Sequence, residues 1–305
     1  MEKVYDMIIV GGGPGGYTAA LYAARAGLDV MLVERLSPGG QMNLTSQIDN
    51  YPGFPEGVDG FQLGYNMQQQ AERFGAKTKY AEVLKLELVG KVKSVHTNEG
   101  VYRAKSVVIS TGANPRELGV EREWEMIGKG LGYCAHCDGM FYRGKTVVVV
   151  GGGNSAVAEA LFLSRIAKEV ILVHRRDSLR ATQIYHKQLM DAPNVRILWN
   201  SRVAELLGEE VLSGVKIENL VSGEVQELEV QGLFVSIGRK PATELVKDQL
   251  TLDSAGYIMA GENTKTNLPG VYAVGDVRTK ELRQIVTAVA DGAMAVHMAE
   301  QELEA

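Results

Sequence analysis

Residues 7–34, MIIVGGGPGGYTAALYAARAGLDVMLVE, decide the fold of this chain. An apolar run at Met7–Val10 ends in glycines and predicts a short buried strand. Residues 13–26 are mostly small and predict a helix that stops at Gly27, because glycine is the usual residue after a helix end. A second buried strand is expected at Val30–Val33. Strand, helix and strand within about 30 residues form a β-α-β unit, which builds a parallel sheet.

The same plan starts again in the middle of the chain, where residues 146–176 read TVVVVGGGNSAVAEALFLSRIAKEVILVHRR. In both blocks the β-α-β unit is followed by short β-like runs and then by a strand that ends in glycine, at Gly112 and at Gly238. A helix is also expected near Phe61–Phe74. The expected later strands are residues 83–88, 91–97, 101–104 and 106–110 in the first block and residues 195–198, 214–218, 227–230 and 233–237 in the second.

The last part of the chain, after Pro241, does not start a third block. It contains strand-like runs at Tyr257–Met259 and Val271–Val274 and an expected helix over residues 284–302. This tail is too short to build its own core, so we expect it to return and complete the first block. The fold class is therefore α/β, with two doubly wound, Rossmann-like nucleotide-binding domains, the second inserted into the first. The expected boundaries are residues 1–115 with 246–305 for the first domain and residues 116–245 for the second.

The composition of the 305 residues is that of an ordinary globular protein, with 45% hydrophobic and 23% charged residues. The formal net charge is −5, the wrong sign for a surface that follows nucleic-acid phosphates, so nucleic-acid binding is not expected. No apolar run reaches the ~18–20 residues that a membrane span needs, and the opening residues lack the features of a signal peptide. We therefore expect a cytoplasmic protein without a membrane partner.

The first glycine motif, Gly11-x-Gly13-x-x-Gly16, lies between an expected strand and an expected helix, the context that dinucleotide binding requires. The first glycine allows a tight turn, the second lets the backbone approach a pyrophosphate, and the third allows helix and strand to pack closely. Glu34 ends the second strand, where its carboxylate can accept hydrogen bonds from a ribose. The motif predicts a dinucleotide site; the alternative is a glycine turn without a function.

The second glycine motif, Gly151-x-Gly153-x-x-Ala156, has alanine in its third position, which is an accepted variant. Basic side chains follow its second strand, at His174, Arg175, Arg176 and Arg180. Arginines there suit a 2′-phosphate through bidentate hydrogen bonds, whereas an acid favours an unphosphorylated ribose. The two motifs therefore predict FAD at the first and NADPH at the second. The alternative for the arginines is a solvated basic surface.

The only two cysteines of the chain form the motif Cys134-Ala135-His136-Cys137-Asp138. This spacing allows a small, reducible disulfide, and after reduction one thiolate can be stabilised by its neighbours. One alternative is zinc, which needs four ligands, although no second cysteine or histidine pair exists. Another is a structural disulfide, whose loop is too short to stabilise much. The motif predicts a redox-active pair and no metal site, with Asp138 as a proton donor and acceptor.

Several motifs together carry a family resemblance: the first glycine motif, CAHCDG (134–139), GGGNSA (151–156), HRRDSLRA (174–181), GVYAVGD (270–276) and RQIVTAVADG (283–292). Over essentially its whole length the chain resembles the bacterial low-molecular-weight thioredoxin reductases, class II of the pyridine nucleotide-disulfide oxidoreductases. The resemblance implies a homodimeric NADPH-dependent thioredoxin-disulfide reductase. Electrons pass from NADPH to FAD, then to Cys134–Cys137, and finally to thioredoxin or a thioredoxin-like protein. The family dithiol usually reads CATC, so His136 is a departure that leaves the redox potential open.

The resemblance also implies roles for individual residues. Cys137 is expected to face the flavin, and Cys134 is expected to attack the partner disulfide. The implied FAD contacts are Gly11, Gly13, Pro14, Gly16, Glu34, Arg35, Gly40, Gln41, Asn50, Thr111, Gly112, Gly275, Asp276, Arg283, Gln284 and Ile285. The implied NADPH contacts are Gly151, Gly153, Asn154, Ser155, Ala156, His174, Arg175, Arg176, Arg180, Ile237 and Gly238.

Two other interpretations stay open at this point. One is a flavoprotein of the same architecture that reduces a glutaredoxin-like or peroxidase-type partner. The other is a non-catalytic, redox-sensing nucleotide-binding module. The dithiol and the NADPH motif lie on the same expected domain, and both need the flavin of the other domain. A hinge rotation at linkers near Pro115–Arg116 and Arg239–Thr243 is therefore expected.

Overall fold

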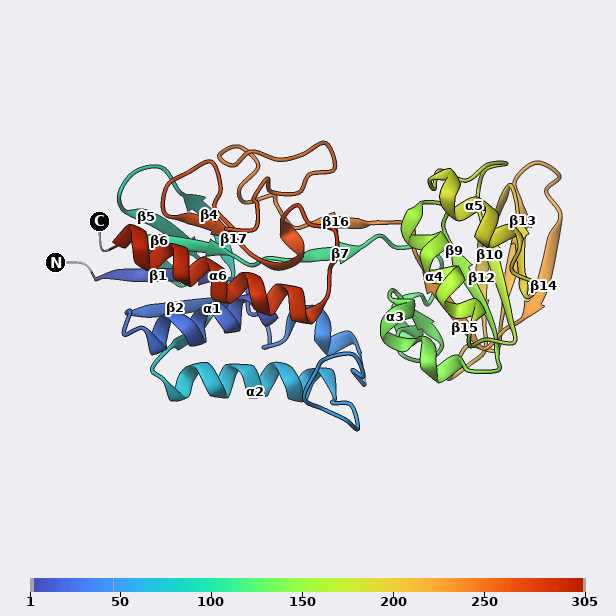
Figure 1. Cartoon of the computed structure of the whole chain (residues 1–305), viewed down its shortest axis with the longest axis horizontal. Helices are drawn as coiled ribbons and strands as arrows, with labels where there is room; N and C mark the ends of the chain where they lie inside the picture. The colour runs from blue at the N-terminus through green and yellow to red at the C-terminus, as the bar shows by residue number, and fades with distance from the viewer. Residues whose placement is uncertain (1–2, 46, 304–305) are drawn as a thin grey trace. The chain divides into compact units, whose positions relative to one another are not determined.

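The structure of the protein, a computed structural model, describes residues 3–45 and 47–303 (Figure 1). The chain forms two compact units, each with a sheet of its own. The first unit combines Met1–Asn114 with Lys240–Ala305, and the second unit is Pro115–Arg239. The second unit is therefore an insertion between the two parts of the first.

The strands of the first unit are β1 (Val4–Val10), β2 (Val30–Glu34), β3 (Lys77–Tyr80), β4 (Val83–Glu87), β5 (Lys93–Thr97), β6 (Gly100–Ile109) and β17 (Val271–Ala273). Its helices are α1 (Pro14–Arg25), α2 (Gly60–Arg73) and α6 (Ile285–Leu303). The sheet has the order β3-β2-β1-β6-β5-β4, with β17 also paired to β6. The pairs among β3, β2, β1, β6 and β17 are parallel, whereas β4, β5 and β6 form an antiparallel meander.

The central strands of this sheet are apolar because both of their faces are covered. Met7, Ile8 and Ile9 of β1 are fully buried. The C-terminal tail completes the unit, since β17 pairs with β6 and α6 packs along α1 (Figure 1). The two helices approach so closely that a Cβ at Gly292 would collide with the carbonyl oxygen of Gly15.

The strands of the second unit are β8 (Leu131–Gly132), β9 (Thr146–Val150), β10 (Glu169–Val173), β11 (Val195–Leu198), β12 (Ser201–Leu207), β13 (Gly214–Asn219), β14 (Val225–Glu229) and β15 (Gly232–Val235). Its helices are α3 (Ala135–Asp138), α4 (Asn154–Ser164) and α5 (Gln183–Met190). A parallel sheet has the order β11-β10-β9-β15-β8, and β12-β13-β14 form a separate antiparallel sheet. Val147, Val148 and Val149 of β9 are fully buried, so the valine run forms the centre of this core.

The expected α/β class with two Rossmann-like domains is confirmed, but individual elements differ. The separation of residues 101–104 from 106–110 is wrong, because the alternation of exposed and buried side chains continues through Lys105 and β6 spans both runs. The run Tyr257–Met259 makes only isolated bridges through Ile258. The sequence patterns do not indicate β3, β8, β12, α3 or α5.

The second connection between the two units also lies earlier in the sequence than expected. Residues 240–245 belong to the first unit and not, as expected, to the second. Ala242 ties them to it, because its carbonyl oxygen accepts the hydroxyl of Thr111 at 2.7 Å and its N–H donates to Gly112 O at 3.0 Å. The two connecting segments form short strands, β7 (Ala113–Pro115) and β16 (Arg239–Pro241), which pair with each other.

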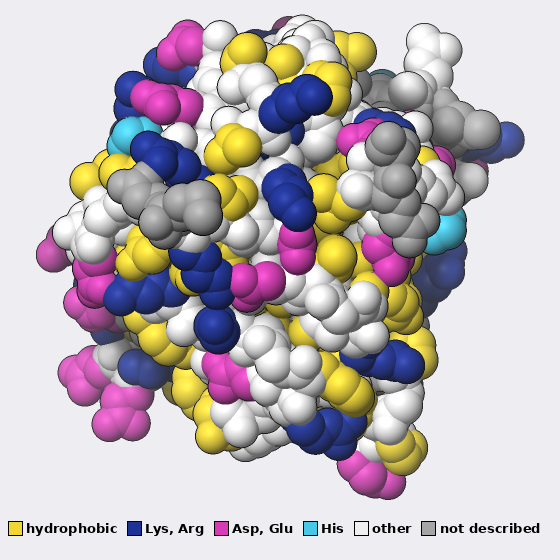
Figure 2. Space-filling model, turned by 90° about the vertical axis from the view of Figure 1, so that its left-hand side faces the viewer, with side chains coloured by type: hydrophobic (Ala, Val, Ile, Leu, Met, Phe, Trp, Pro, Cys, Tyr) yellow, Lys and Arg dark blue, Asp and Glu magenta, His cyan; other side chains and the backbone are white. Residues whose placement is uncertain are grey.

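The surface carries charges of both signs. Figure 2 shows one face of the molecule, where lysines and arginines lie among aspartates, glutamates and apolar side chains. Within residues 3–45 and 47–303, no helix is long and apolar enough to cross a membrane.

Candidate functional site

The first glycine loop connects β1 to α1 and leaves one position open. Gly11 has φ +104°, and a Cβ there would collide with the carbonyl oxygen of Ser110. A Cβ at Gly16 would collide with the carbonyl oxygen of Gly11, so this residue lets α1 approach the end of β1. At Gly13 a Cβ would meet no atom within 4 Å. The loop therefore offers open backbone at its middle glycine, where a pyrophosphate can approach.

Glu34 lies at the end of β2 beside this loop. Its Oε2 accepts the N–H of Gly12 at 2.7 Å, and its Oε1 accepts the N–H of Leu36 at 3.0 Å. Each carboxylate oxygen can accept more than one hydrogen bond, so the group is oriented and still has capacity for a ribose diol.

The second glycine loop, between β9 and α4, repeats the geometry of the first. Gly151 has φ +153°, and a Cβ there would collide with Ser236 O and with the side chain of Ala156. A Cβ at Gly153 would meet nothing within 4 Å. Both loops therefore have a crowded first glycine and an open middle glycine, as dinucleotide binding requires.

His174 supports this second loop from inside. It is 4% exposed, and its ring lies where a Cβ at Gly152 would be, while its Nε2 is 3.0 Å from the carbonyl oxygen of Ser178. Burial lowers the pKa of His174, which favours a neutral ring. The carbonyl oxygen of Gly152 also accepts the N–H of Arg180 at 2.7 Å. His174 thus connects the glycine loop to the arginine segment that follows β10.

The side chains of Arg175, Arg176 and Arg180 are exposed. None of the three forms an ion pair with another described residue. Arginines without a carboxylate partner at the rim of a glycine loop are available to an anionic ligand. Asn154 also lies here, and its Oδ1 accepts the N–H of Thr182 at 2.9 Å.

In the first unit, segments far apart in sequence meet near the expected flavin residues. Asn50 donates from Nδ2 to Oε1 of Gln284 at 3.0 Å, which brings two expected FAD contacts together. Gln41 donates to Asn114 Oδ1 at 3.1 Å. The guanidinium group of Arg283 lies 4.0 Å from the centre of the Tyr257 ring.

The structure gives other expected FAD contacts a local environment of their own. Gly112 and Gly275 have φ values of +71° and +72°, which side chains rarely adopt. Ile285 packs against the apolar cluster around Met42. Arg35 is exposed, 3.9 Å from a carboxylate oxygen of Glu82.

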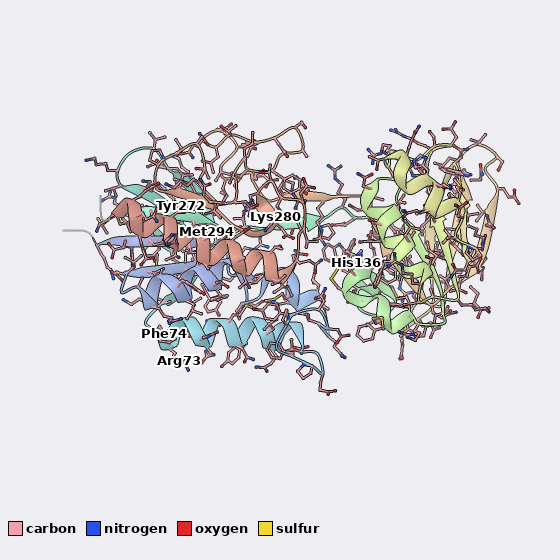
Figure 3. All side chains as sticks on the ribbon, viewed as in Figure 1. Arg73, Phe74, His136, Tyr272, Lys280 and Met294 are labelled. Atoms are coloured by element: carbon pink, nitrogen blue, oxygen red, sulfur yellow. A yellow bond between two sulfur atoms is a disulfide. The ribbon has the colours of Figure 1, made fainter. Side chains whose placement is uncertain are left out.

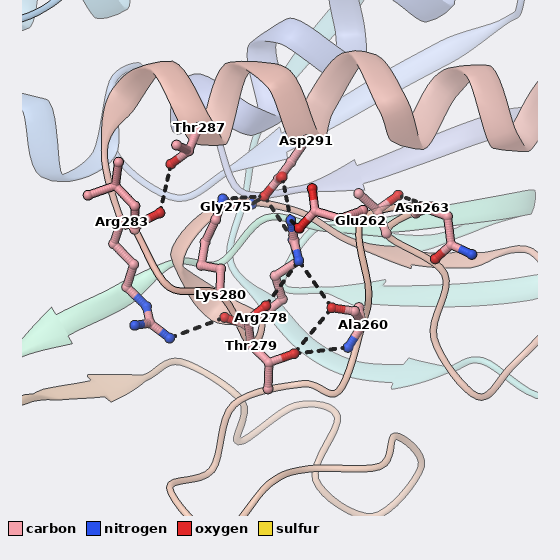
Figure 4. A network of polar contacts seen from close by, with 12 residues as sticks. Ala260, Glu262, Asn263, Gly275, Arg278, Thr279, Lys280, Arg283, Thr287 and Asp291 are labelled. Atoms are coloured by element: carbon pink, nitrogen blue, oxygen red, sulfur yellow. Dashed lines mark hydrogen bonds and ion pairs between the residues drawn. The ribbon is translucent and has the colours of Figure 1, made fainter.

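A buried polar network that the sequence analysis does not predict lies beside Gly275 (Figure 4). The carboxylate of Asp291 on α6 accepts the N–H of Gly275 at 2.8 Å and the ammonium group of Lys280 at 2.7 Å, and it also pairs with Arg278. Burial alone raises the pKa of Asp291, but the hydrogen bonds from Arg278 and Lys280 outweigh it and hold this pKa below its usual value. The network fixes the turn at Gly275–Val277.

The two cysteines form a disulfide in the second unit, with Cα atoms 5.3 Å apart. The short helix α3 starts between them, and the N–H groups of Cys137 and Asp138 both donate to Cys134 O at 3.1 Å. The His136 ring, labelled in Figure 3, stacks on Phe162 of α4, and the two ring centroids are 4.6 Å apart. The structure thus places a disulfide within one short turn that rests on α4.

Among the described residues, no three histidines, cysteines, aspartates or glutamates lie close enough to hold a metal ion. One more acidic group does stand out near the dithiol: Glu159 of α4, whose Oε2 is buried without a hydrogen-bond partner. The sequence signal for it is a single charged residue in the apolar stretch NSAVAEALFLS.

Known proteins resemble this chain over its whole length. The pyridine nucleotide-disulphide oxidoreductase family matches residues 5–292. A thioredoxin reductase of Streptomyces clavuligerus is 45% identical, over 100% of this chain and 96% of that protein. A thioredoxin reductase of Listeria monocytogenes is 43% identical, over 99% of this chain and 95% of that protein. The solved thioredoxin reductase from Streptococcus pyogenes matches with a TM-score of 0.93 and 44% identity, over 100% of this chain and 99% of the other.

Proposed function

Since the chain belongs to the pyridine nucleotide-disulphide oxidoreductase family, we propose that its two glycine loops and its dithiol together carry electrons from NADPH to thioredoxin. It is an NADPH-dependent flavoprotein disulfide reductase, a thioredoxin reductase. The observation that carries the residue assignments is the disulfide Cys134–Cys137, which lies in the same unit as a glycine loop flanked by exposed arginines.

The residues of the first unit fit FAD. The open backbone at Gly13 accommodates the pyrophosphate, and the positive end of α1 favours its charge. Glu34 binds the adenosine ribose. Asp276 and the segment 283–285 meet the ribityl chain and the ring, held in place by the Asp291 network. When bound, the flavin accepts a hydride from NADPH and supplies two electrons to a disulfide.

The residues of the second unit fit NADPH in the same way. The open backbone at Gly153 receives the pyrophosphate. Arg175, Arg176 and Arg180 bind the 2′-phosphate, because their guanidinium groups are exposed and lack carboxylate partners among the described residues. His174 acts from behind the loop: it holds Gly152 and the Arg180 segment in register.

The two cysteines have different tasks in this proposal. Cys137 takes the electrons on the flavin side, and Cys134 attacks the disulfide of the partner protein. Asp138 holds or releases the proton that must accompany each electron pair. Its carboxylate lies beside Gly132, where a Cβ would be 3.0 Å from its Oδ2.

We also propose that the protein is a homodimer in the cytoplasm. Helices α1, α2 and α6, together with the residue that follows α2, expose apolar side chains that a second copy can cover: Tyr22, Tyr65, Phe74 and Met294. In the cytoplasm thioredoxin keeps protein thiols reduced, which requires a reductase of this kind. Light scattering of the purified holoenzyme measures the dimer directly, and a monomer at micromolar concentration contradicts it.

The decisive experiment is the NADPH-dependent reduction of a disulfide reagent, with and without thioredoxins from the same organism. We expect the yellow flavin absorption to bleach on addition of NADPH and the reagent to turn over only when a thioredoxin is present. Bleaching without turnover for any thioredoxin indicates a reductase for another disulfide partner. A protein that neither binds flavin nor responds to NADPH is a non-catalytic module.

A further inference from the structure

Glu159 is the only charged residue of α4, and the electron path proposed above does not use it. Burial raises the pKa of its carboxyl group to about 7, although hydrogen bonds with Ser236 and with the backbone of Ala135, and the charge of Arg239, act in the opposite direction. The side chain is partly exposed, but its Oε2 is buried without a hydrogen-bond partner, which is costly for a carboxylate, so this group can exchange a proton near neutral pH.

Helix α4 meets the dithiol turn at two positions on one of its faces. Glu159 faces the N–H of Ala135, the residue directly after Cys134. Three residues later, Phe162 stacks under His136, and a Cβ on Gly139 would lie 2.9 Å from its ring. Residues three apart lie on the same side of a helix. Glu159 and Phe162 therefore form the support on which residues 134–139 rest.

We propose that Glu159 is a positioning residue of the dithiol, which holds the backbone between the two sulfurs and makes the disulfide–dithiol equilibrium depend on its own charge. The inference rests on the proposed function, in which Cys134 and Cys137 cycle between disulfide and dithiol. Reduction breaks the S–S bond and adds two electrons and two protons, or one proton when one sulfur remains a thiolate. An ionised Glu159 opposes that thiolate by like-charge repulsion, and a protonated Glu159 does not.

Other charged and titratable groups near this carboxyl are few. Arg239, at the end of the second unit, favours the ionised form of Glu159. On α3 the titratable neighbours are His136 and Asp138. Burial lowers the pKa of His136, which favours its neutral ring. The comparison of wild type with Glu159→Gln therefore isolates the ionisation of Glu159 from that of these groups and of the thiols.

The test measures the dithiol alone, in the full-length holoenzyme without NADPH or thioredoxin. The protein is equilibrated with mixtures of reduced and oxidised dithiothreitol between pH 6 and pH 8.5. Thiols are then alkylated, and the peptide with Cys134 and Cys137 is quantified by mass spectrometry. The variants are Glu159→Gln, which cannot ionise, and Ser236→Ala, which removes a hydrogen bond to the carboxyl. The matched control is Glu169→Gln, whose carboxylate forms an exposed ion pair with Arg196.

We expect the equilibrium constants for dithiol formation in wild type and Glu159→Gln to agree at pH 6. At pH 8 the variant should favour the dithiol by about three- to tenfold, because its thiolate has no charged neighbour. In wild type the hydrogen bond with Ser236 lowers the pKa of Glu159, so its loss in Ser236→Ala should raise this pKa. The pH at which the equilibrium constant falls below that of Glu159→Gln should therefore be higher in Ser236→Ala than in wild type. Glu169→Gln should follow wild type throughout.

The inference is overturned if the Glu159→Gln and wild-type curves coincide at every pH while the wild-type pair interconverts reversibly. A wild-type disulfide that dithiothreitol does not reduce overturns the proposed function as well. If circular dichroism shows that Glu159→Gln does not fold, the Ser236→Ala curve decides: an upward shift supports the inference, and an unchanged curve refutes it.

Discussion

Arg278 and Asp291 meet at two points inside the first unit: Nε donates to Oδ2 at 2.9 Å and Nη2 donates to Oδ1 at 2.7 Å. Their side chains are only 2% and 7% exposed. The geometry matches a guanidinium fork to a carboxylate, which is the strongest arrangement for such a pair. Because the same carboxylate holds Gly275, one acidic residue on α6 determines the shape of a turn that is expected to bind FAD.

Asp291→Asn should destabilise the first unit by about 3–5 kcal/mol, because it leaves two buried cations without their counter-charge. Urea unfolding followed by circular dichroism measures the loss. Both tryptophans, Trp124 and Trp199, lie in the second unit, so the midpoint read by tryptophan fluorescence should move much less. Asp29→Asn is the matched control: its pair with Lys3 is exposed to solvent, so its loss should change stability little. Equal effects of the two substitutions contradict the prediction.

The same pair predicts how stability depends on pH. Because the pKa of Asp291 is held below its usual value, its contribution is fully present above the unfolded-state pKa of about 4 and disappears as pH falls through the lower folded-state value. The difference in unfolding free energy between wild type and Asp291→Asn should therefore be constant from pH 7 to pH 5 and shrink below pH 4. A difference that grows in acid has the wrong sign for this mechanism.

Two neighbouring glycines of the second loop should respond differently to alanine. Gly152→Ala forces the buried ring of His174 to move and should cost about 1–3 kcal/mol of stability, together with weaker NADPH binding. Gly153→Ala meets no atom, so it should leave the melting temperature nearly unchanged and still weaken NADPH binding by blocking the approach of the pyrophosphate. Calorimetry and fluorescence titration separate the two effects. A Gly152→Ala protein that melts and binds like wild type excludes the role given to His174.

Arg175→Ala combined with Arg176→Ala should weaken NADPH and spare NADH. Each lost charge-assisted contact to a phosphate is worth about 1.5–3 kcal/mol, roughly ten- to hundredfold in affinity. The KM values for the two nucleotides provide the measurement. Arg196→Ala removes an arginine that already pairs with Glu169, and it should change neither value. Wild-type enzyme that uses NADH as well as NADPH is incompatible with this assignment.

Single cysteine variants should distinguish the two sulfurs. Cys137→Ser removes the resolving sulfur, so Cys134 should remain bound to thioredoxin as a mixed disulfide. Cys134→Ser should leave a thiolate near the flavin and give a long-wavelength absorption band. Neither variant should turn over, and NADPH should bleach the flavin in both. Trapping with a thioredoxin that lacks its own resolving cysteine, read on a gel, identifies the sulfur; capture through Cys137 reverses the assignment.

The sequence predicts those parts of the site that depend on local backbone geometry. Gly11 and Gly151 have the positive φ values that their motifs require, and the dithiol turn follows from the spacing of Cys134 and Cys137. The parts that it does not predict arise from partners distant in the chain. Nothing in the local pattern shows that Asp291 receives Arg278, or that Glu159 lies against Ala135.

The predicted boundaries of domains and strands are also wrong where they depend on contacts between distant parts of the chain. The run at residues 240–245 looks like a continuation of the second block, but it belongs to the first unit because Ala242 bonds to Thr111 and Gly112. Likewise, the alternation through Lys105 becomes clear only when β6 is seen between β1 and β5. Such tertiary contacts override local propensity.

The division of the first unit into two sequence segments reverses the order of folding during synthesis. When residue 239 leaves the ribosome, the second unit has all of its strands, whereas the first still lacks β17 and α6. Domains usually fold from the N-terminus onward, but here the inner unit is complete first. Until residues 240–305 are translated, the nascent chain presents β6 without β17, one of its two parallel neighbours, and α1 without α6. The time needed to translate this last segment therefore sets how long the sheet of the first unit stays incomplete.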